Sequence, residues 1–363
     1  MKKLIMVSLF LGLFISMVSA QQLIGAKAAG MGGAGVANVT DLSAVYYNPA
    51  ALMESGVQAA EMKITLGAAY SKPDKLMAAL SKSSDPAQFL LDNYANDLTF
   101  SGNLNGVIGL NFRNIGISIL PLATTTVSKA QNSVVGTVTG TAQYNSVLTL
   151  GTSLALPGIP LGTLNVGLNA KNINAANGSI ITTGGATSAS GTRLVSSGTG
   201  MGFDVGAMAS FNIPMVSNFR VGAVMRDLGE SIKYTNKSQF SYLNQATLGT
   251  VTTEAEVPLA DTTTNVDSST VVGASAVIPV IGLTVAGDVE MLKSGSNTHL
   301  GIEYPMLMNL LILRAGTASG PDLSLTTYGV KINLPILTLD AAMISNAKTP
   351  DLSSAVVDIN IGF

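Results

Sequence analysis

Apolar and polar residues alternate along most of the chain, in runs of roughly ten residues separated by Gly, Asn, Asp, Ser and Pro. The last run, SAVVDINIGF, carries aliphatic side chains at every second position, with Asp358 and Asn360 between them. A period of two is the pattern of a β-strand whose two faces meet different surroundings. The pattern therefore predicts an all-β chain built from strands with one apolar and one polar face.

Charged and amide residues occupy the second face of several of these runs. THLGIEYPM sets His299 and Glu303 opposite Leu300 and Ile302, and LTVAGDVEML alternates in the same way. The core of a soluble β-sandwich requires bulky aliphatic residues on its inner faces. A barrel with a wet or plugged lumen does not, because its apolar face points outward to lipid. We therefore expect a transmembrane antiparallel up-and-down β-barrel of about fourteen strands.

Two kinds of segment interrupt the strand rhythm. DPAQFLLDNYANDL has the start signals of a helix, with Asp85 as N-cap and Pro86 at the first helical position, so we expect a helical insert over about 73–99. The stretches 173–200 and 244–270 are rich in Gly, Ser and Thr. Their composition is typical of mobile loops or of weak strand extensions.

The N-terminus has the three parts of a secretory signal peptide. Lys2 and Lys3 precede an apolar stretch over 4–18, and Val-Ser-Ala at 18–20 is a small-residue cleavage site. We expect cleavage after Ala20, which gives three parts: a signal peptide at 1–20, an N-terminal segment at 21–55 and a barrel domain at 56–363. An uncleaved membrane anchor is the alternative, although the apolar stretch is short for one.

Composition narrows the class of protein. Hydrophobic residues make up 47% of the chain and charged residues 11%, where about 25% is usual for a soluble globular protein. A secreted soluble β protein remains an alternative to the barrel. The net charge of −2 gives no support for nucleic-acid binding, and the absence of Cys excludes disulfides and thiolate metal sites.

The segment GAKAAGMGGAGVANVTDLSAVYYNPAAL, at 25–52, differs from the strands that follow. Its glycines and alanines permit tight turns and close backbone approach. Asp41 is a candidate N-cap for a short helix over Leu42 to Tyr47, and Asn48-Pro49 would end that helix. Small side chains suit a plug inside a lumen, but a surface arm fits the residues equally well.

The same segment resembles the N-terminal signature of the long-chain fatty acid transporter (FadL) superfamily of bacterial outer-membrane barrels, which also includes secretion-associated members. The resemblance covers about 28 residues, from GMGGA through an acidic residue to SA-Y-NPA. It implies a fourteen-stranded barrel, passage of hydrophobic molecules and an N-terminal hatch in the lumen. It also implies a C-terminal aromatic assembly signal, Phe363. The hatch residues that it points to are Gly30, Met31, Gly32, Gly33, Asp41, Tyr46, Asn48, Pro49 and Ala50.

These features predict an outer-membrane channel for the passive uptake of fatty-acid-like or hydrocarbon molecules. Its partners would be the outer-membrane lipid bilayer and the ligand. The alternative is a barrel that docks a protein of a secretion or surface-attachment system. Asn48 is expected to hydrogen-bond to backbone of the plug or the wall, and Pro49 to fix the turn into the first strand.

No catalytic, cofactor or metal site is expected. The single histidine, His299, lies on the polar face of a strand, without a nucleophile motif nearby. A lumen-lining or hydrogen-bonded histidine is therefore expected rather than a catalytic one. The glycines of GMGGAG are not a dinucleotide-binding loop, because no strand precedes them.

Overall fold

We analysed a computed structural model of the chain. It describes residues 23–39, 41–55, 61–70, 100–112, 114–130, 132–133, 135–155, 162–183, 190–213, 216–244, 250–321, 323–348 and 353–362. The signal peptide, the helical insert at 73–99 and Phe363, all expected from the sequence, lie outside the described residues.

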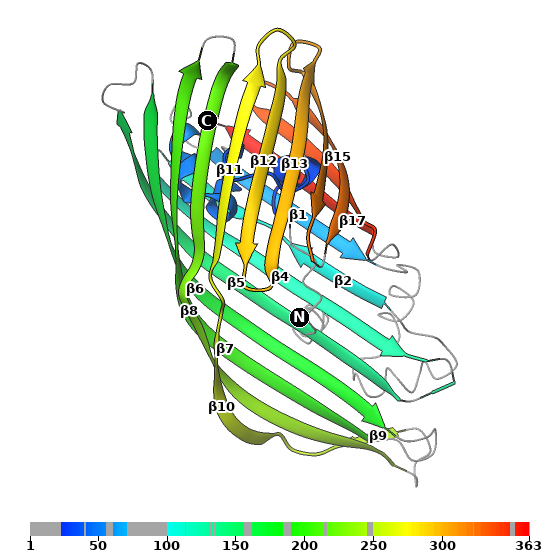
Figure 1. Ribbon diagram of the computed structural model, residues 1–363. Coiled ribbons are helices and arrows are strands. Elements are labelled where there is room, and N and C mark those ends of the chain that lie inside the picture. The colour runs from blue at the N-terminus through cyan, green and yellow to red at the C-terminus, as the bar shows by residue number, and fades with distance from the viewer. Residues whose placement is uncertain are drawn as a thin grey trace.

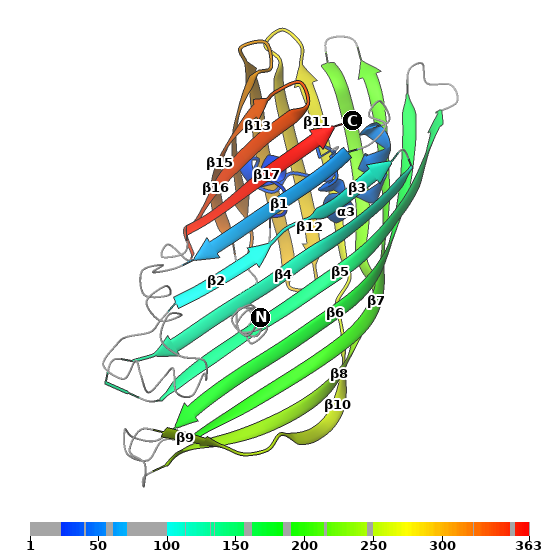
Figure 2. The same ribbon diagram turned by 180° about the vertical axis from the view of Figure 1, so that it is seen from behind.

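The strands form one closed antiparallel β-barrel (Figures 1 and 2). Their bounds are β1 (Glu61–Tyr70), β2 (Phe100–Asn105), β3 (Ile108–Phe112), β4 (Ile115–Lys129), β5 (Gly136–Ala155), β6 (Thr163–Thr183), β7 (Ser190–Ile213), β8 (Val216–Asn244), β9 (Thr250–Thr253), β10 (Val257–Asn265), β11 (Ser269–Ile278), β12 (Leu283–Leu292), β13 (Gly295–Met306), β14 (Leu311–Ser319), β15 (Ser324–Asn333), β16 (Leu337–Asn346) and β17 (Ser353–Gly362).

The seventeen strand segments fill fourteen positions around the barrel. β2 and β3 share one position, because both pair with β4. β9, β10 and β11 share another, because all three pair with successive parts of β8. β1 pairs with β17 along ten residues, which closes the ring. The expected fold and strand number are therefore confirmed.

Burial follows the alternation of the sequence, with polar residues inside and apolar residues outside. In β1 Lys63 is 1% exposed and its neighbour Ile64 is 44% exposed. In β13 His299 is 1% exposed and Leu300 is 53% exposed. This is the reverse of a soluble protein and is the arrangement expected where the outward face meets lipid.

Two sides of the barrel differ in height (Figure 1). On one side, β5 to β8 are 20 to 29 residues long. On the other, β11 to β17 are 9 to 12 residues long, about the length that crosses a bilayer. We call β4 to β8 the long wall and β11 to β17 the short wall.

One of the Gly/Ser/Thr-rich stretches, 173–200, forms strands of the long wall. β6 continues to Thr183 and β7 starts at Ser190, and they pair without a bulge from 163 to 183. The sequence left two possibilities for 173–200. In the described part of this stretch the residues form strand extensions, and the alternative of mobile loops was wrong there. Full backbone pairing satisfies the polar groups of residues whose own strand propensity is weak.

Before β1 the described residues fold into three short helices, drawn in dark blue inside the barrel in Figures 1 and 2. They are α2 (Ala26–Gly30), α3 (Ala44–Tyr47) and the 3₁₀-helix η1 (Pro49–Ser55). Within the described ranges no helix is long and apolar enough to cross a membrane.

Candidate functional site

The described part of the N-terminal segment, residues 23–39 and 41–55, lies inside the barrel at the level of the short wall. α2 lies against β14 to β17, and η1 lies against β5 to β7. Of the residues with described side chains in this segment, all but Lys27, Asp41, Tyr46 and Glu54 are buried. We call residues 23–39 its first half and residues 41–55 its second half.

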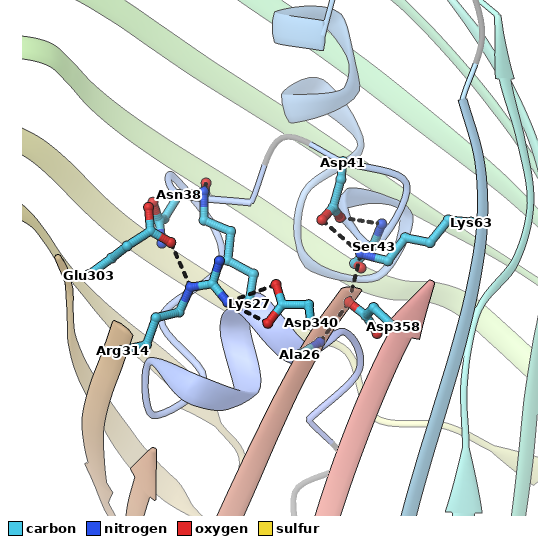
Figure 3. Close-up of polar contacts among 10 residues, drawn as sticks. All are labelled: Ala26, Lys27, Asn38, Asp41, Ser43, Lys63, Glu303, Arg314, Asp340 and Asp358. Atoms are coloured by element: carbon cyan, nitrogen blue, oxygen red, sulfur yellow. Dashed lines mark hydrogen bonds and ion pairs between the residues drawn. The ribbon is translucent and has the colours of Figure 1, made fainter. Parts of the chain in front are cut away.

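Carboxylates of the short wall hold the backbone of the first half. Asp288 on β12 accepts hydrogen bonds from the N–H groups of Gly35, at 2.7 Å, and Val36, at 2.9 Å. Asp358 on β17 accepts one from the N–H of Ala26 at 2.8 Å (Figure 3). A carboxylate that accepts backbone N–H groups makes stronger hydrogen bonds than a neutral acceptor would.

Other polar side chains of the short wall add further contacts to the first half. The N–H of Gly32 donates to Oγ1 of Thr327 at 2.9 Å, and its carbonyl lies 2.7 Å from Nδ1 of His299. The hydroxyl of Ser275 donates to the carbonyl of Ala37 at 2.7 Å. The expectation of a hydrogen-bonded His299 is therefore confirmed.

Glycines allow the first half to touch the wall backbone. Gly32 has a φ of +69°, and a Cβ on it would lie 2.5 Å from the carbonyl oxygen of Thr317. Opposite it, a Cβ on Gly316 would lie 2.2 Å from the N atom of Gly32. Both the backbone conformation and the space therefore require glycine here.

The remaining residues of the GMGG motif are packed in the same way. A Cβ on Gly30 would lie 3.0 Å from the Cα of Gly329, and one on Gly33 would lie 2.8 Å from Nδ1 of His299. Met31 is fully buried against Ala34 and Ala286. Its sulfur accepts a hydrogen bond from Asn38.

An ion-pair cluster joins the two halves to the seam where the barrel closes (Figure 3). Lys63 of β1 lies 2.7 Å from Asp41 and 2.9 Å from Asp358 of β17. Burial alone would raise the pKa of Asp41. However, the Lys63 ammonium, together with hydrogen bonds from Lys63 and from the Ser43 N–H, holds the pKa of that carboxyl below its usual range.

The second helix begins later than the sequence suggested. Its N-cap is Ser43 rather than Asp41, and α3 covers only Ala44–Tyr47. The turn before it is closed by an i→i+3 bond from the N–H of Ala44 to the carbonyl of Asp41, so it is not α-helical. Asp41 still accepts the N–H of Ser43, as a capping side chain does.

Asn48 links the second half both to the first half and to the long wall. Its Nδ2 donates to the carbonyls of Val36 and of Ala207 on β7, each at 3.1 Å. Its Oδ1 accepts the N–H of Ala50 at 3.1 Å. The hydrogen bonds expected of Asn48 are present. The expectation for Pro49 was wrong, because it begins η1 instead of turning directly into β1.

Amide side chains of the long wall hold the rest of the second half. Asn169 on β6 donates to the carbonyl of Val45 at 2.7 Å and to Asp204 at 2.9 Å. Asn165 on the same strand donates to Glu54 at 2.8 Å. Reading the sequence alone did not identify these residues, because inward alternation marks a residue as lumen-facing without showing what it meets.

Beside the segment, charged residues of the wall form two more clusters. Lys171 on β6 contacts Asp204, Glu230 and Asp227, with the first two at 2.9 and 2.7 Å. Arg226 on β8 lies 3.5 Å from Glu290 and 5.1 Å from the ring centroid of Tyr46. Tyr46 meets Tyr47 edge-to-face.

A fourth cluster lies beside α2 (Figure 3). Arg314 on β14 contacts Glu303 at 2.6 Å and both oxygens of Asp340, at 2.6 and 2.7 Å. Lys27 donates to the carbonyl of Asn38 at 2.9 Å. Burial lowers the pKa of Lys27, an effect that the negative charge of Glu303 partly offsets.

A cavity of about 680 Å³ opens on the long wall, away from the N-terminal segment. Pro121, Tyr144, Asn174, Thr199 and Lys233 line it and are consecutive partners in the strand register. Paired residues share a face, and on β6 this face is the one that carries the exposed Leu168. Most of the lining therefore faces outward, and we do not assign the cavity to the lumen.

Comparison with known proteins identifies the fold. A scan against protein-family models finds no match, and a search of curated proteins finds none. Solved structures do match over nearly the whole chain. The toluene transporter TbuX of Ralstonia pickettii is 13% identical, with 93% of this chain and 98% of that chain covered and a TM-score of 0.58. The toluene transporter TodX of Pseudomonas putida is 12% identical, with coverages of 93% and 98% and a TM-score of 0.56.

A FadL homologue of Pseudomonas aeruginosa is 11% identical, with 97% of this chain and 99% of that chain covered and a TM-score of 0.52. The chain shares the fold of these channels. The fold resemblance expected from the N-terminal signature is therefore shown. TbuX and TodX are named as transporters rather than as enzymes. Among the described residues, no group of His, Asp and Glu is placed to hold a metal ion.

Proposed function

We propose that the protein is an outer-membrane channel through which hydrophobic small molecules enter passively. One observation carries the proposal: an N-terminal segment fills the lumen of a barrel whose fold is shared with toluene transporters and a FadL homologue. The outward aliphatic belt supports the membrane location. The predicted signal peptide supports export to the outer membrane.

In this proposal the N-terminal segment is a movable hatch. Away from Glu54, which pairs with Arg220 and accepts hydrogen bonds from Asn165 and Ser210, its second half is connected to the long wall by few, neutral hydrogen bonds, mainly those of Asn48 and Asn169. Such bonds contribute about 1 kcal/mol each, so local displacement is within reach of thermal opening. The hatch residues are the nine suggested by the sequence.

An apolar patch on the long wall would receive the ligand. Ile181, Leu194, Phe240 and Tyr242 are 40 to 50% exposed. The register places them on the same face as Lys171, which points into the lumen. The ring centroids of Phe240 and Tyr242 lie 6.3 Å apart. Exposed large apolar side chains grouped beyond the short wall are typical of a binding surface.

Deletion of residues 23–50 tests the hatch. The deleted protein should still assemble, because the barrel closes through β1 and β17, and it should admit hydrophobic dyes faster than the full mature chain. Assembly is checked by β-sheet circular dichroism and by heat-dependent gel mobility. Unchanged dye entry through a correctly assembled barrel would refute the hatch.

Native mass spectrometry of the protein extracted gently from its own membranes tests the transport proposal as a whole. A co-purifying hydrophobic molecule without a protein partner is expected. A stoichiometric protein partner with an empty lumen would instead indicate docking, a function that the comparisons do not support. Absence of the protein from washed outer membranes would contradict the proposed location.

A further inference from the structure

The ionisable groups around the N-terminal segment carry an excess of negative charge. In the described part of the lumen they comprise six cations and nine carboxylates. The cations are Lys27, Lys63, Lys171, Arg226, Arg314 and Lys331. The carboxylates are Asp41, Asp204, Asp227, Glu230, Asp288, Glu290, Glu303, Asp340 and Asp358. The pair of Arg220 with Glu54 adds no net charge, so the excess persists even if two carboxylates are protonated.

Four cations of the wall are also covered by carboxylates. Lys171 faces three carboxylates, whereas Lys63 and Arg314 face two each. Arg226 lies between Glu290 and the Tyr46 ring. A ligand anion could gain one of these cations only by replacing a carboxylate already in contact with it. Leaving a buried carboxylate unpaired is costly.

In the Lys171 and Lys63 clusters the groups that reach open space are carboxylates. Among the ion-paired side chains of the Lys171 and Lys63 clusters, Asp227 is 31% exposed and Asp41 24%, whereas Lys171 is 5% and Lys63 2% exposed. A solute that approaches these clusters therefore meets negative charge first. In a narrow space with low-dielectric walls such charge is weakly screened.

We propose that the channel admits uncharged hydrophobic molecules and excludes their carboxylate counterparts, with Asp227 as a main determinant of that selectivity. The inference rests on the proposed function and narrows its substrate class from hydrophobic molecules in general to neutral ones. Alcohols and hydrocarbons would pass, and ionised fatty acids of the same chain length would not.

Matched probes that differ only in the head group test the inference. Vesicles with an outer leaflet of lipopolysaccharide are prepared with and without the full mature protein, and the influx of radiolabelled 1-decanol and decanoate is measured at pH 8. At this pH decanoate is ionised. The protein-dependent influx of decanol should exceed that of decanoate by roughly tenfold or more, as expected for like charges at close range.

Substitution Asp227→Asn tests the assigned residue. Asn keeps the size of the side chain and tolerates the φ of +59° at this position. It should raise decanoate influx roughly threefold to tenfold and leave decanol influx unchanged. Asp261→Asn is the control, because it removes the same charge from an exposed pair with Lys233 and should change neither rate.

Salt gives a second measurement that needs no variant. Raising the salt concentration from 0.01 to 1 M shortens the screening length from about 30 Å to about 3 Å, so decanoate influx through the unmodified protein should rise. Equal influx of the two probes, or no response to salt and to Asp227→Asn, would overturn the inference alone. If neither probe enters faster than into protein-free vesicles, the proposed function fails and the inference with it.

Discussion

The two halves of the N-terminal segment are held in different ways. The first half offers backbone groups, and the short wall reaches them with side chains, among them Asp288, Asp358 and Thr327. The second half supplies side chains of its own, Asn48 and Glu54, which contact the long wall. The Gly/Ala-rich composition of residues 25–35 explains the difference, because such residues bring little beyond backbone to a contact.

This difference indicates which half of the N-terminal segment is displaced more easily from the lumen. The first half is fixed by charged acceptors and by glycine-dependent backbone contact, which tolerates little displacement. The second half is fixed by neutral amide bonds to the long wall around Asn48, and its ion pairs in the described part of the chain lie at its two ends, through Asp41 and Glu54. Two protease sites report separately on them, because Lys27 lies in the first half and Glu54 in the second. Cleavage after each in the purified protein measures how often that half leaves the lumen.

The largest effect is expected from Gly32→Ala. The new Cβ would combine an unfavourable φ of +69° with backbone atoms at 2.5 Å. We expect the contact of the first half to weaken by about 3 kcal/mol or more, and tryptic cleavage after Lys27 to accelerate.

Gly229→Ala is the matched control for Gly32→Ala. Gly229 has a similar φ of +61° but open space around its Cβ position. The substitution should destabilise the folded protein by only about 1 kcal/mol, which is the cost of the positive φ itself, and it should not expose Lys27. Equal effects of the two substitutions would contradict the claim that close backbone contact holds the first half.

Asn48→Ala should have the next largest effect, about 2 kcal/mol, because two donated hydrogen bonds and one accepted bond are lost. Cleavage after Glu54 should accelerate more than cleavage after Lys27. Asn48→Asp separates the contributions, since it keeps the acceptor for the Ala50 N–H and loses both donors. Wild-type cleavage rates in both variants would show that Asn48 does not retain the second half.

Asp288→Asn should have a smaller effect, about 1 kcal/mol. The amide oxygen can still accept the N–H groups of Gly35 and Val36, but without the charge the bonds are weaker. Only cleavage after Lys27 should respond. Faster cleavage after Glu54 would mean that the two halves are released together, as one unit.

The smallest effect is expected from pH, through Asp41. The pKa of this carboxyl is lowered in the folded protein, so its contribution is complete above the unfolded value of 3.8 and is lost as the pH falls below it. Hydrogen exchange of residues 41–48, corrected for the intrinsic pH dependence, should be constant from pH 7 to about 5 and should increase below about 4. Asp41→Asn should abolish this step.

Much of the architecture followed from the sequence, because alternation survives whatever the strands pair with. The outward position of Leu300 and the inward position of His299 depend only on a period of two. The hydrogen bonds of Asn48 were also expected, because an amide side chain packed inside a barrel requires polar partners. The start of α3 and the role of Pro49 were missed because local rules do not register competing 3₁₀ turns.

The sequence by itself determined the barrel, the approximate strand number and the low bulk of the N-terminal segment, because these depend on local periodicity and composition. Only the tertiary structure decided that Asp288 and Asp358, more than 250 residues from the backbone groups that they bind, hold the first half. It also decided that Asp227 and Asp41 rather than the lysines reach open space. Such contacts depend on the closure and register of the whole barrel. Closure brings together residues that are far apart along the chain, and no local sequence pattern indicates that they will be in contact.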